Sequence, residues 1–196
     1  MLRWREKFPD LQLCLVEGLR HSTGPMVRDA TLDMCLAPRA PQGQEDPAIR
    51  FKPIAQLNQI VVARCGHPLA HRLRTPRSAA ELAGPDWLSN LQHLAAAETL
   101  RAVGVPEPRQ IMECESFSAM RSLLVKSDML ALVQHPFLGM PHVADDIQEI
   151  PIAERLPGKT VSLHTRADAP LTRPAAALAR LLVDVGRKLL QRPLAP

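Results

Sequence analysis

The sequence contains few aromatic residues and no long apolar run. Tyr is absent, and Phe and Trp together make up 3% of the 196 residues. A sheet of stacking aromatic side chains for single-stranded nucleic acid is therefore not expected. No run of about 18 apolar residues occurs, so we expect no membrane-spanning helix. Residues 1–10 are charged and lack an apolar segment, which argues against a secretory signal peptide.

Metal-binding and redox motifs are also lacking. The four cysteines form no C-x-x-C pair, and they stand at Cys14, Cys35, Cys65 and Cys114. We interpret them as small buried side chains in a reducing cytosol. His67 and His71 are four residues apart, but Pro68 lies between them and no third ligand has a defined spacing. We therefore predict no metal site and a loop at this position.

No catalytic or cofactor-binding motif is present. The sequence has no G-x-S-x-G, no G-x-G-x-x-G after a strand and no G-x-x-x-x-G-K-[ST]. Glu113 and Glu115 alternate on one expected strand and are typical of a solvated face or a partner surface. Asp145 and Asp146 are typical of a solvated turn. We predict neither enzymatic activity nor a cofactor, and a small α/β enzyme that uses His135 or Cys65 stays open as an alternative.

Composition indicates an ordinary globular protein. Hydrophobic residues make up 46% of the chain and charged residues 22%, which fits one domain or two small lobes that bury a sizeable core. The net charge of +4 is scattered, with no block of five like charges, so charge alone does not indicate nucleic-acid binding. The 19 prolines separate many short elements.

Apolar runs alternate with amphipathic segments along the chain. Strands are expected at 11–16, 32–36, 49–54, 57–63, 86–88, 109–115, 129–133, 147–152 and 160–165. Helices are expected at 22–31 with Pro25 in the first turn, after Ser78, at 91–103, from Ser116 or Ser118 to Ser127, and after Thr172. This order predicts an α/β protein with mostly parallel sheets.

The elements fall into two groups. We expect one lobe from residues 1–57 with 158–196 and a second lobe from residues 58–157. A chain that leaves a lobe and later returns to it makes two crossing strands, which predicts a hinged cleft.

Polar residues follow three of the expected strands. In open α/β sheets, ligands bind beyond the carboxyl ends of strands, where helix N-termini present free N–H groups. The corresponding segments here are 18–22, 115–118 and 134–136. Ser116 and Ser118 also suit helix capping, which is compatible with binding. Arg20 beside His21 predicts an anionic ligand.

Six fragments in order resemble the effector-binding domain of LysR-type transcriptional regulators. They are WREKFPDLQLCLVEG at 4–18, TLDMCL at 31–36, IVVARCGHPLA at 60–70, ELAG at 81–84, ESFS at 115–118 with DMLALV at 128–133, and RADAPLT at 166–172. The resemblance covers nearly the whole chain. It implies two α/β subdomains joined by two crossover strands, similar to type II periplasmic binding proteins. It also implies a cytoplasmic protein that controls transcription when a small metabolite binds.

The resemblance assigns contacts residue by residue. The effector contacts would be Leu19, Arg20, His21, Ser22, Ala37, Pro38, Ser116, Phe117, Ser118, Gln134, His135 and Pro136. A dimer or tetramer would form through the surfaces 2–15 and 109–126. His135-Pro136 stands where the family usually has Pro, which is a departure from the family pattern in this loop.

The resemblance also implies missing parts. The family's winged helix-turn-helix, which binds DNA, and the first strand of its first subdomain have no counterpart in this sequence. One alternative is therefore a truncated interaction module that dimerises with full-length relatives. The effector, the regulated genes and the choice between activation and repression are open.

Overall fold

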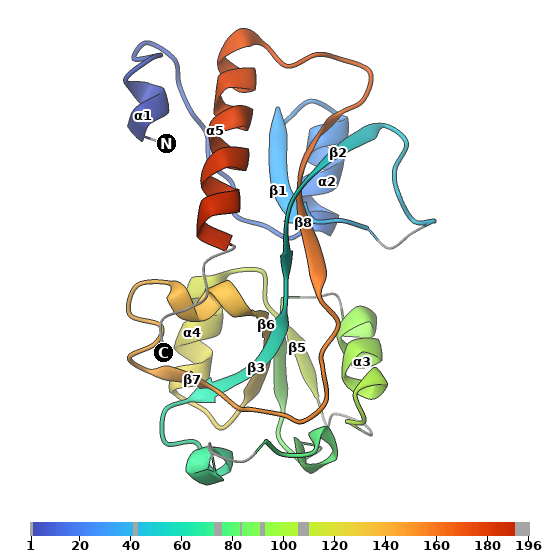
Figure 1. The fold of residues 1–196 in the computed structure, drawn as a ribbon, viewed down its shortest axis with the longest axis vertical. Coiled ribbons are helices and arrows are strands. Elements are labelled where there is room, and N and C mark those ends of the chain that lie inside the picture. The colour runs from blue at the N-terminus through green and yellow to red at the C-terminus, as the bar shows by residue number, and fades with distance from the viewer. Residues whose placement is uncertain are drawn as a thin grey trace. The chain divides into compact units, whose positions relative to one another are not determined.

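The computed structural model describes residues 2–40, 43–72, 76–82, 84–90, 93–105 and 110–190. The chain divides into two compact units, Met1–Gln56 with Lys159–Pro196 (unit 1) and Leu57–Gly158 (unit 2). Each unit has its own sheet and helices (Figure 1). That these units act as the two lobes of an effector-binding domain stays a prediction.

Unit 1 is built on a three-stranded sheet. Its order is β1 (Met34–Pro38), β8 (Lys159–Arg166) and β2 (Ile49–Leu57). β1 and β8 are antiparallel, with Met34 opposite Thr165 and Pro38 opposite Val161. Among the residues that the structure describes, β8 is the strand paired with β1.

Three helices accompany this sheet: α1 (Leu2–Arg5), α2 (Arg20–Arg28) and α5 (Arg173–Leu190). Helix α5 begins after Thr172, whose hydroxyl accepts a hydrogen bond from the Ala175 amide at 3.4 Å, as the sequence predicts. Its buried residues recur at helical spacing and are Ala175, Leu178, Ala179 and Val183. α2 packs against β1 and β8.

Unit 2 is built on a five-stranded sheet. Its order is β5 (Ile111–Glu113), β4 (Trp87–Ser89), β6 (Leu130–Gln134), β3 (Gln59–Arg64) and β7 (Ile147–Glu149). Two α-helices, α3 (His93–Ala102) and α4 (Phe117–Val125), and three short 3₁₀ helices complete the described elements; the latter are η1 (Pro68–Arg72), η2 (Ala79–Leu82) and η3 (His135–Gly139).

The expectation of mostly parallel sheets is wrong. β4 is parallel to β5 and β6, but β3 is antiparallel to β6 and β7, and β1 is antiparallel to β8. β2 and β3 belong to different sheets, although only Asn58 separates them in the sequence.

The core of unit 2 lies on both faces of its sheet. Val61, Leu130 and Leu132 belong to one hydrophobic cluster, whereas Ile60 and Val62 belong to the other. Successive side chains of a strand point to opposite faces, so both faces of β3 are buried. This explains why β3 is a continuous apolar run in the sequence.

The strand expected at 11–16 is wrong. These residues carry no regular structure, and Leu15 is 67% exposed. Their apolar pattern is suited to a buried strand, but a strand forms only beside a partner with free backbone groups. No described strand lies beside this segment in either sheet.

Helix α2 also differs from its prediction. It begins at Arg20, two residues earlier than expected, so Pro25 lies in the second turn and not in the first. Pro25 has no amide hydrogen to donate there.

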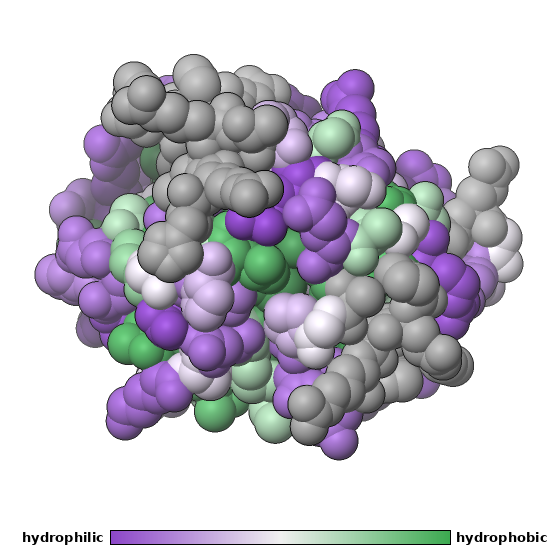
Figure 2. All heavy atoms as spheres, turned by 90° about the horizontal axis from the view of Figure 1, so that it is seen from below, coloured by the Kyte–Doolittle hydropathy of each residue, from purple (hydrophilic) through white to green (hydrophobic). Residues whose placement is uncertain are grey.

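The part of the surface shown in Figure 2 is mostly hydrophilic, with hydrophobic side chains visible in small areas only. Among the described residues, no helix is both long enough and apolar enough to cross a membrane.

Candidate functional site

The predicted binding segment 19–22 forms the start of α2. Leu19 is the N-cap, and its carbonyl accepts hydrogen bonds from the amides of Ser22 at 3.0 Å and Thr23 at 2.9 Å. The hydroxyl groups of both residues also donate to it, at 2.8 and 3.0 Å. Arg20 and His21 are thus the first two residues of the helix, where the dipole favours negative charge.

Ala37 and Pro38 lie at the end of β1 in the same unit. Ala37 is 5% exposed and Pro38 is half-buried. The Ala37 backbone shares a hydrogen bond with the ring of His164 on β8. The end of β1 and the start of α2 therefore both lie near His164, because the Arg20 charge also acts on that ring.

His164 is a residue that the sequence analysis missed. The pKa of its ring is lowered to about 4; burial is the largest cause, the Arg20 charge also lowers the pKa, and a hydrogen bond with the Ala37 backbone opposes both. The ring is therefore neutral at pH 7. Its Nε2 is buried and, within the described part of the chain, lacks a hydrogen-bond partner.

Ser162 is the second residue that was missed. It lies two residues before His164 on β8, so both side chains share one face, and its buried hydroxyl also lacks a partner among the described residues. The sequence contains an alternating pattern that could have indicated these two positions. Polar Thr160, Ser162 and His164 alternate with apolar Val161 and Leu163.

Unit 2 contains the predicted segment 116–118 at the start of α4. Ser116 is the N-cap, and its hydroxyl accepts a hydrogen bond from the Ala119 amide at 3.4 Å. Ser118 lies inside the first turn and is not the cap. The first turn of α4 therefore combines hydroxyl groups with the positive end of a helix dipole.

The segment 134–136 lies beside this helix start. Gln134 ends β6, and His135 begins η3 with its amide bonded to the Asn58 carbonyl at 2.9 Å. Phe117 and Phe137 pack with ring centroids 5.7 Å apart. Phe117 is the first residue of α4 and Phe137 lies in η3, so this contact packs the start of α4 against η3 within unit 2.

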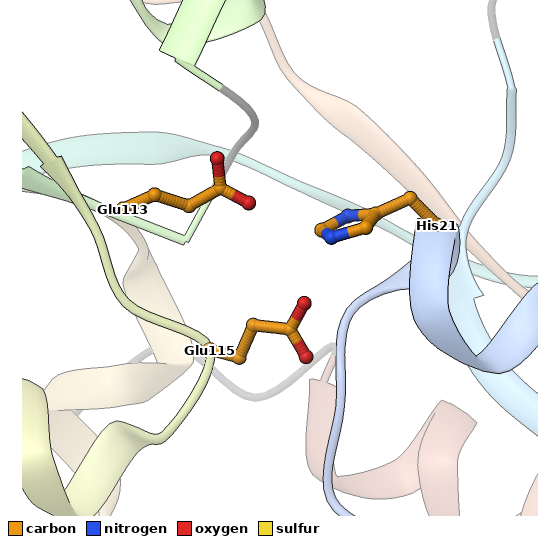
Figure 3. Close-up of side chains that lie close together, drawn as sticks. All are labelled: His21, Glu113 and Glu115. Carbon is orange, nitrogen blue, oxygen red and sulfur yellow. The ribbon is translucent and has the colours of Figure 1, made fainter.

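Two acidic residues precede α4. Glu113 ends β5, and Glu115 lies in the irregular segment after it, so the expectation of both on one strand is wrong. Their side chains still extend in a similar direction (Figure 3), with carboxylate oxygens within 4.8 Å. Figure 3 also labels His21, which belongs to α2 in unit 1.

The histidines considered as metal ligands have different environments. His67 is 2% exposed; its Nε2 lies 3.1 Å from the Asp128 carbonyl, and its Nδ1 accepts from the Leu69 amide at 3.0 Å. Both ring nitrogens therefore serve local structure. The side chain of His71 lies outside the described residues.

The interpretation of the cysteines as buried is wrong for two of them. Cys14 and Cys65 are exposed, and Cys35 and Cys114 are half-buried. Cys14 is exposed because the segment 11–16 joins no sheet. Burial raises the pKa of the Cys35 thiol, and a hydrogen bond with Thr23 opposes this.

Comparisons with known proteins extend this description. The family model described as LysR substrate binding domain matches residues 1–187. The transcriptional regulator GbpR of Azospirillum brasilense is 24% identical over 94% of this chain and 56% of its own length. GalR of Pseudomonas putida is 26% identical over 94% of this chain and 47% of its own length. The chain thus spans about half the length of these curated relatives.

Solved structures show the same fold. The effector-binding domain of QuiR in complex with shikimate superposes with a TM-score of 0.71 at 15% identity, covering 95% of this chain and 88% of that one. The regulatory domain of Synechocystis CcmR in complex with 2-PG gives 0.70 at 14% identity over 97% and 88%. The BenM effector-binding domain with benzoate gives 0.69 at 14% identity over 98% and 87%.

The fold is therefore the mixed α/β fold of type II periplasmic-binding-protein-like effector domains. A family match over residues 1–187 covers nearly the whole chain. The chain belongs to the LysR substrate-binding domain family.

Proposed function

We propose that this chain is the effector-sensing part of a LysR-type transcriptional regulator and controls transcription by binding a small metabolite in the cytoplasm. The observation that carries the proposal is the position of two helix starts. α2 begins at Arg20, and α4 begins after its cap Ser116. Helix N-termini bind anionic groups through free amides and the helix dipole.

We propose that the effector carries a carboxylate. Arg20 supplies a fixed positive charge at the start of α2, whereas His164 is neutral at pH 7 because its pKa is about 4. A guanidinium group can pair with a carboxylate through two hydrogen bonds. Shikimate and benzoate, named with the QuiR and BenM domains, are also carboxylates.

The proposed contacts on unit 1 are Leu19, Arg20, His21, Ser22, Ala37 and Pro38. Those on unit 2 are Ser116, Phe117, Ser118, Gln134, His135 and Pro136. Support comes from the arrangement inside each unit. In unit 1, the Arg20 charge and the Ala37 backbone both act on the pKa of His164. In unit 2, Phe117 of α4 packs on Phe137 of η3. By mass action, the effector then favours the arrangement of the units to which it binds more tightly.

Isothermal titration against a panel of small carboxylates, including benzoate and shikimate, tests the site. Arg20→Ala is expected to weaken binding about tenfold or more, since a charge-assisted hydrogen bond contributes about 1.5–3 kcal/mol. Arg28→Ala is the matched control, because it removes the same charge from the last residue of the same helix. If the wild-type protein, Arg20→Ala and Arg28→Ala bind every carboxylate with equal affinity, Arg20 does not contact the effector.

We propose that the bound metabolite is not converted. Nuclear magnetic resonance spectra of a bound carboxylate, recorded before and after overnight incubation with the protein, should be identical. A new product would instead favour an enzyme, and His135→Ala and Cys65→Ala would then show which side chain is required.

We also propose self-association through the surfaces 2–15 and 109–126; Arg109 lies outside the described residues. Each surface exposes large apolar side chains, including Leu2 at 80%, Met112 at 47% and Leu123 at 38%. Leu2→Asp and Leu123→Asp are expected to lower the mass measured by analytical ultracentrifugation, whereas Met140→Asp, at an exposed site elsewhere, should not. An unchanged mass in all variants contradicts this interface.

A further inference from the structure

Unit 2 contains two glutamines that lie opposite each other at one end of its sheet. Gln59 begins β3 and Gln134 ends β6, and the antiparallel register of these neighbouring strands pairs the two residues (Figure 1). Residues directly opposite each other in such a pair place their side chains on the same face, with β-carbons about 4.5–5.5 Å apart. The two side-chain amides can therefore both contact one small group.

The glutamine pair lies at the end of the sheet where the parallel strands finish. β4 and β6 are parallel, and Ser89, the last residue of β4, is in register with Leu132 of β6. Gln134 lies two residues beyond Leu132 and is therefore beyond the end of β4. In open α/β sheets, ligands bind beyond the carboxyl ends of the strands. The pair thus lies where a ligand of unit 2 is expected.

Gln59 is a buried polar residue beside apolar neighbours. Because side chains alternate along a strand, Gln59 shares a face of β3 with Val61, which belongs to the same hydrophobic cluster as Leu132. Gln59 is 4% exposed, and its Oε1 has no hydrogen-bond partner in the parts of the chain whose structure is described. An amide without a partner in such a position is unfavourable. Gln134 beside it is only half-buried, so part of the pair is accessible to a ligand.

Two side-chain amides restrict the chemical group that can bind. Each amide has an oxygen that accepts hydrogen bonds and an NH₂ group that donates them, and neither carries a charge. A hydroxyl group both donates and accepts, so it can donate to the oxygen of one glutamine and accept from the nitrogen of the other. A carboxylate can only accept and an ammonium group can only donate, and either would be buried without an opposite charge. The pair therefore suits a hydroxyl group.

We propose that Gln59 is a further effector contact and that Gln59 and Gln134 together bind a hydroxyl group of the effector. This inference rests on the proposed function, because it assigns the glutamine pair to the same effector. It narrows the class of effector from a carboxylate to a hydroxycarboxylate. Gln59 is not among the contacts that the family resemblance implies; its register with Gln134 and its buried amide assign it this role.

Matched carboxylates test whether the pair recognises a hydroxyl group. Shikimate and cyclohexene-1-carboxylate share a ring and a carboxylate but differ in their hydroxyl groups, as do 3-hydroxybenzoate and benzoate. In isothermal titration, the wild-type protein is expected to bind the hydroxylated member of at least one pair about fivefold or more tightly. Gln59→Leu should remove this preference and leave the affinity for the other member unchanged. The variant is expected to fold, since leucine is apolar and the buried amide that it replaces has no partner among the described residues.

Gln148→Leu is the matched control for this substitution. Gln148 lies on β7 opposite Ala63, towards the other end of β3, and its side chain donates to the Arg64 carbonyl at 3.3 Å. This variant should retain the preference for the hydroxylated member. If Gln59→Leu also retains it, or if no bound pair shows a preference, the hydroxyl site is wrong. The proposed function survives that result when Arg20→Ala still weakens carboxylate binding.

A probe without a carboxylate tests the same site independently of Arg20. Ethylene glycol and dimethoxyethane have the same O–C–C–O skeleton, but only ethylene glycol has hydroxyl hydrogens to donate. Nuclear magnetic resonance follows the side-chain amide signals of the nitrogen-15-labelled wild-type protein, and the Gln59 signals are identified by their loss in Gln59→Leu or Gln59→Met.

Ethylene glycol is expected to shift the Gln59 signals until they saturate, whereas dimethoxyethane should not. Equal shifts with both probes, or no shift with either, overturn the proposal whatever the carboxylates do. If ethylene glycol alone shifts the signals and no carboxylate binds, the hydroxyl site stands and the proposal of a carboxylate effector is wrong.

Discussion

His164 packs edge-on against Phe51, with ring centroids 4.7 Å apart and an interplanar angle of 86°. His164 is 2% exposed, and the Arg20 charge acts on the same ring. Burial and a nearby positive charge both disfavour the imidazolium form. The packing of unit 1 therefore favours the neutral form of the His164 ring over the protonated form.

The stability of unit 1 is expected to fall in mild acid. The folded-state pKa of His164 is about 4, below the value of about 6.5 for an unperturbed histidine. As the pH falls, the imidazole of the unfolded chain takes up a proton before that of the folded chain. The contribution of the neutral His164 ring to the free energy of unfolding is therefore fully present above about pH 6.5 and is lost as the pH falls towards 4. The slope in this window is at most about 1.4 kcal/mol per pH unit.

Urea unfolding followed by circular dichroism between pH 7.5 and pH 4 measures this slope. His164→Gln should remove its part of the pH dependence, whereas His142→Gln, at an 83% exposed side chain, should retain it. Identical slopes in wild type and His164→Gln contradict the assignment.

Ser162→Ala is expected to stabilise unit 1 slightly. The Ser162 hydroxyl is fully buried and has no hydrogen-bond partner in the described part of the chain. Removing such a group relieves a desolvation cost of about 1 kcal/mol. Thr23→Val is the contrast, because the Thr23 hydroxyl donates to Leu19 at 3.0 Å, and its loss should destabilise. The urea midpoints of the two variants should shift in opposite directions.

Trp4→Phe is expected to destabilise unit 1. The Trp4 indole Nε1 donates to the Pro174 carbonyl at 2.9 Å and thereby ties α1 to the start of α5. Its loss should cost about 1 kcal/mol beyond the effect of the smaller ring.

Trp87→Phe is the matched control for that hydrogen bond. Trp87 is 0% exposed, and its indole nitrogen has no acceptor among the residues described. This variant loses ring volume but no hydrogen bond, so a smaller destabilisation is expected in urea unfolding. If Trp87→Phe lowers the free energy of unfolding more than Trp4→Phe does, the hydrogen bond from Trp4 to Pro174 does not make the expected contribution to stability.

Gly104→Ala is expected to destabilise unit 2 by about 1 kcal/mol, because a β-carbon disfavours the left-handed region. Gly104 follows α3 with φ of +93°, and a β-carbon there meets no atom within 4 Å. Conformational strain is therefore the main cost. Gly84→Ala, also with open space but without a positive φ, should have little effect. Thermal melting compares them, and equal midpoints would show that the turn after α3 tolerates a side chain.

Much of the fold could be predicted from local pattern. The β-branched run before Ala63 became β3, and the periodic leucines after Thr172 became α5. Ser116 was predicted as a cap and is one. Such features depend on the intrinsic propensities and the spacing of residues that are close together in the sequence, so they can be predicted without knowledge of the tertiary structure.

The candidate site was predicted less completely. The starts of α2 and α4 follow from capping and from the resemblance, but Ser162 and His164 were missed. On a strand, burial depends on which neighbour covers each face, and α2, which packs on β8, lies more than 130 residues away in the sequence.

The sequence by itself determined the family, the periodic helix α5 and the apolar strand β3, because each is encoded by neighbouring residues. Tertiary structure decided the rest. LQLCLV at 11–16 has the composition of a buried strand but belongs to no sheet, since strand formation requires backbone groups supplied by another segment. For the same reason, the position of β1 in its sheet became visible only when its antiparallel partner β8, more than 120 residues later in the sequence, was known.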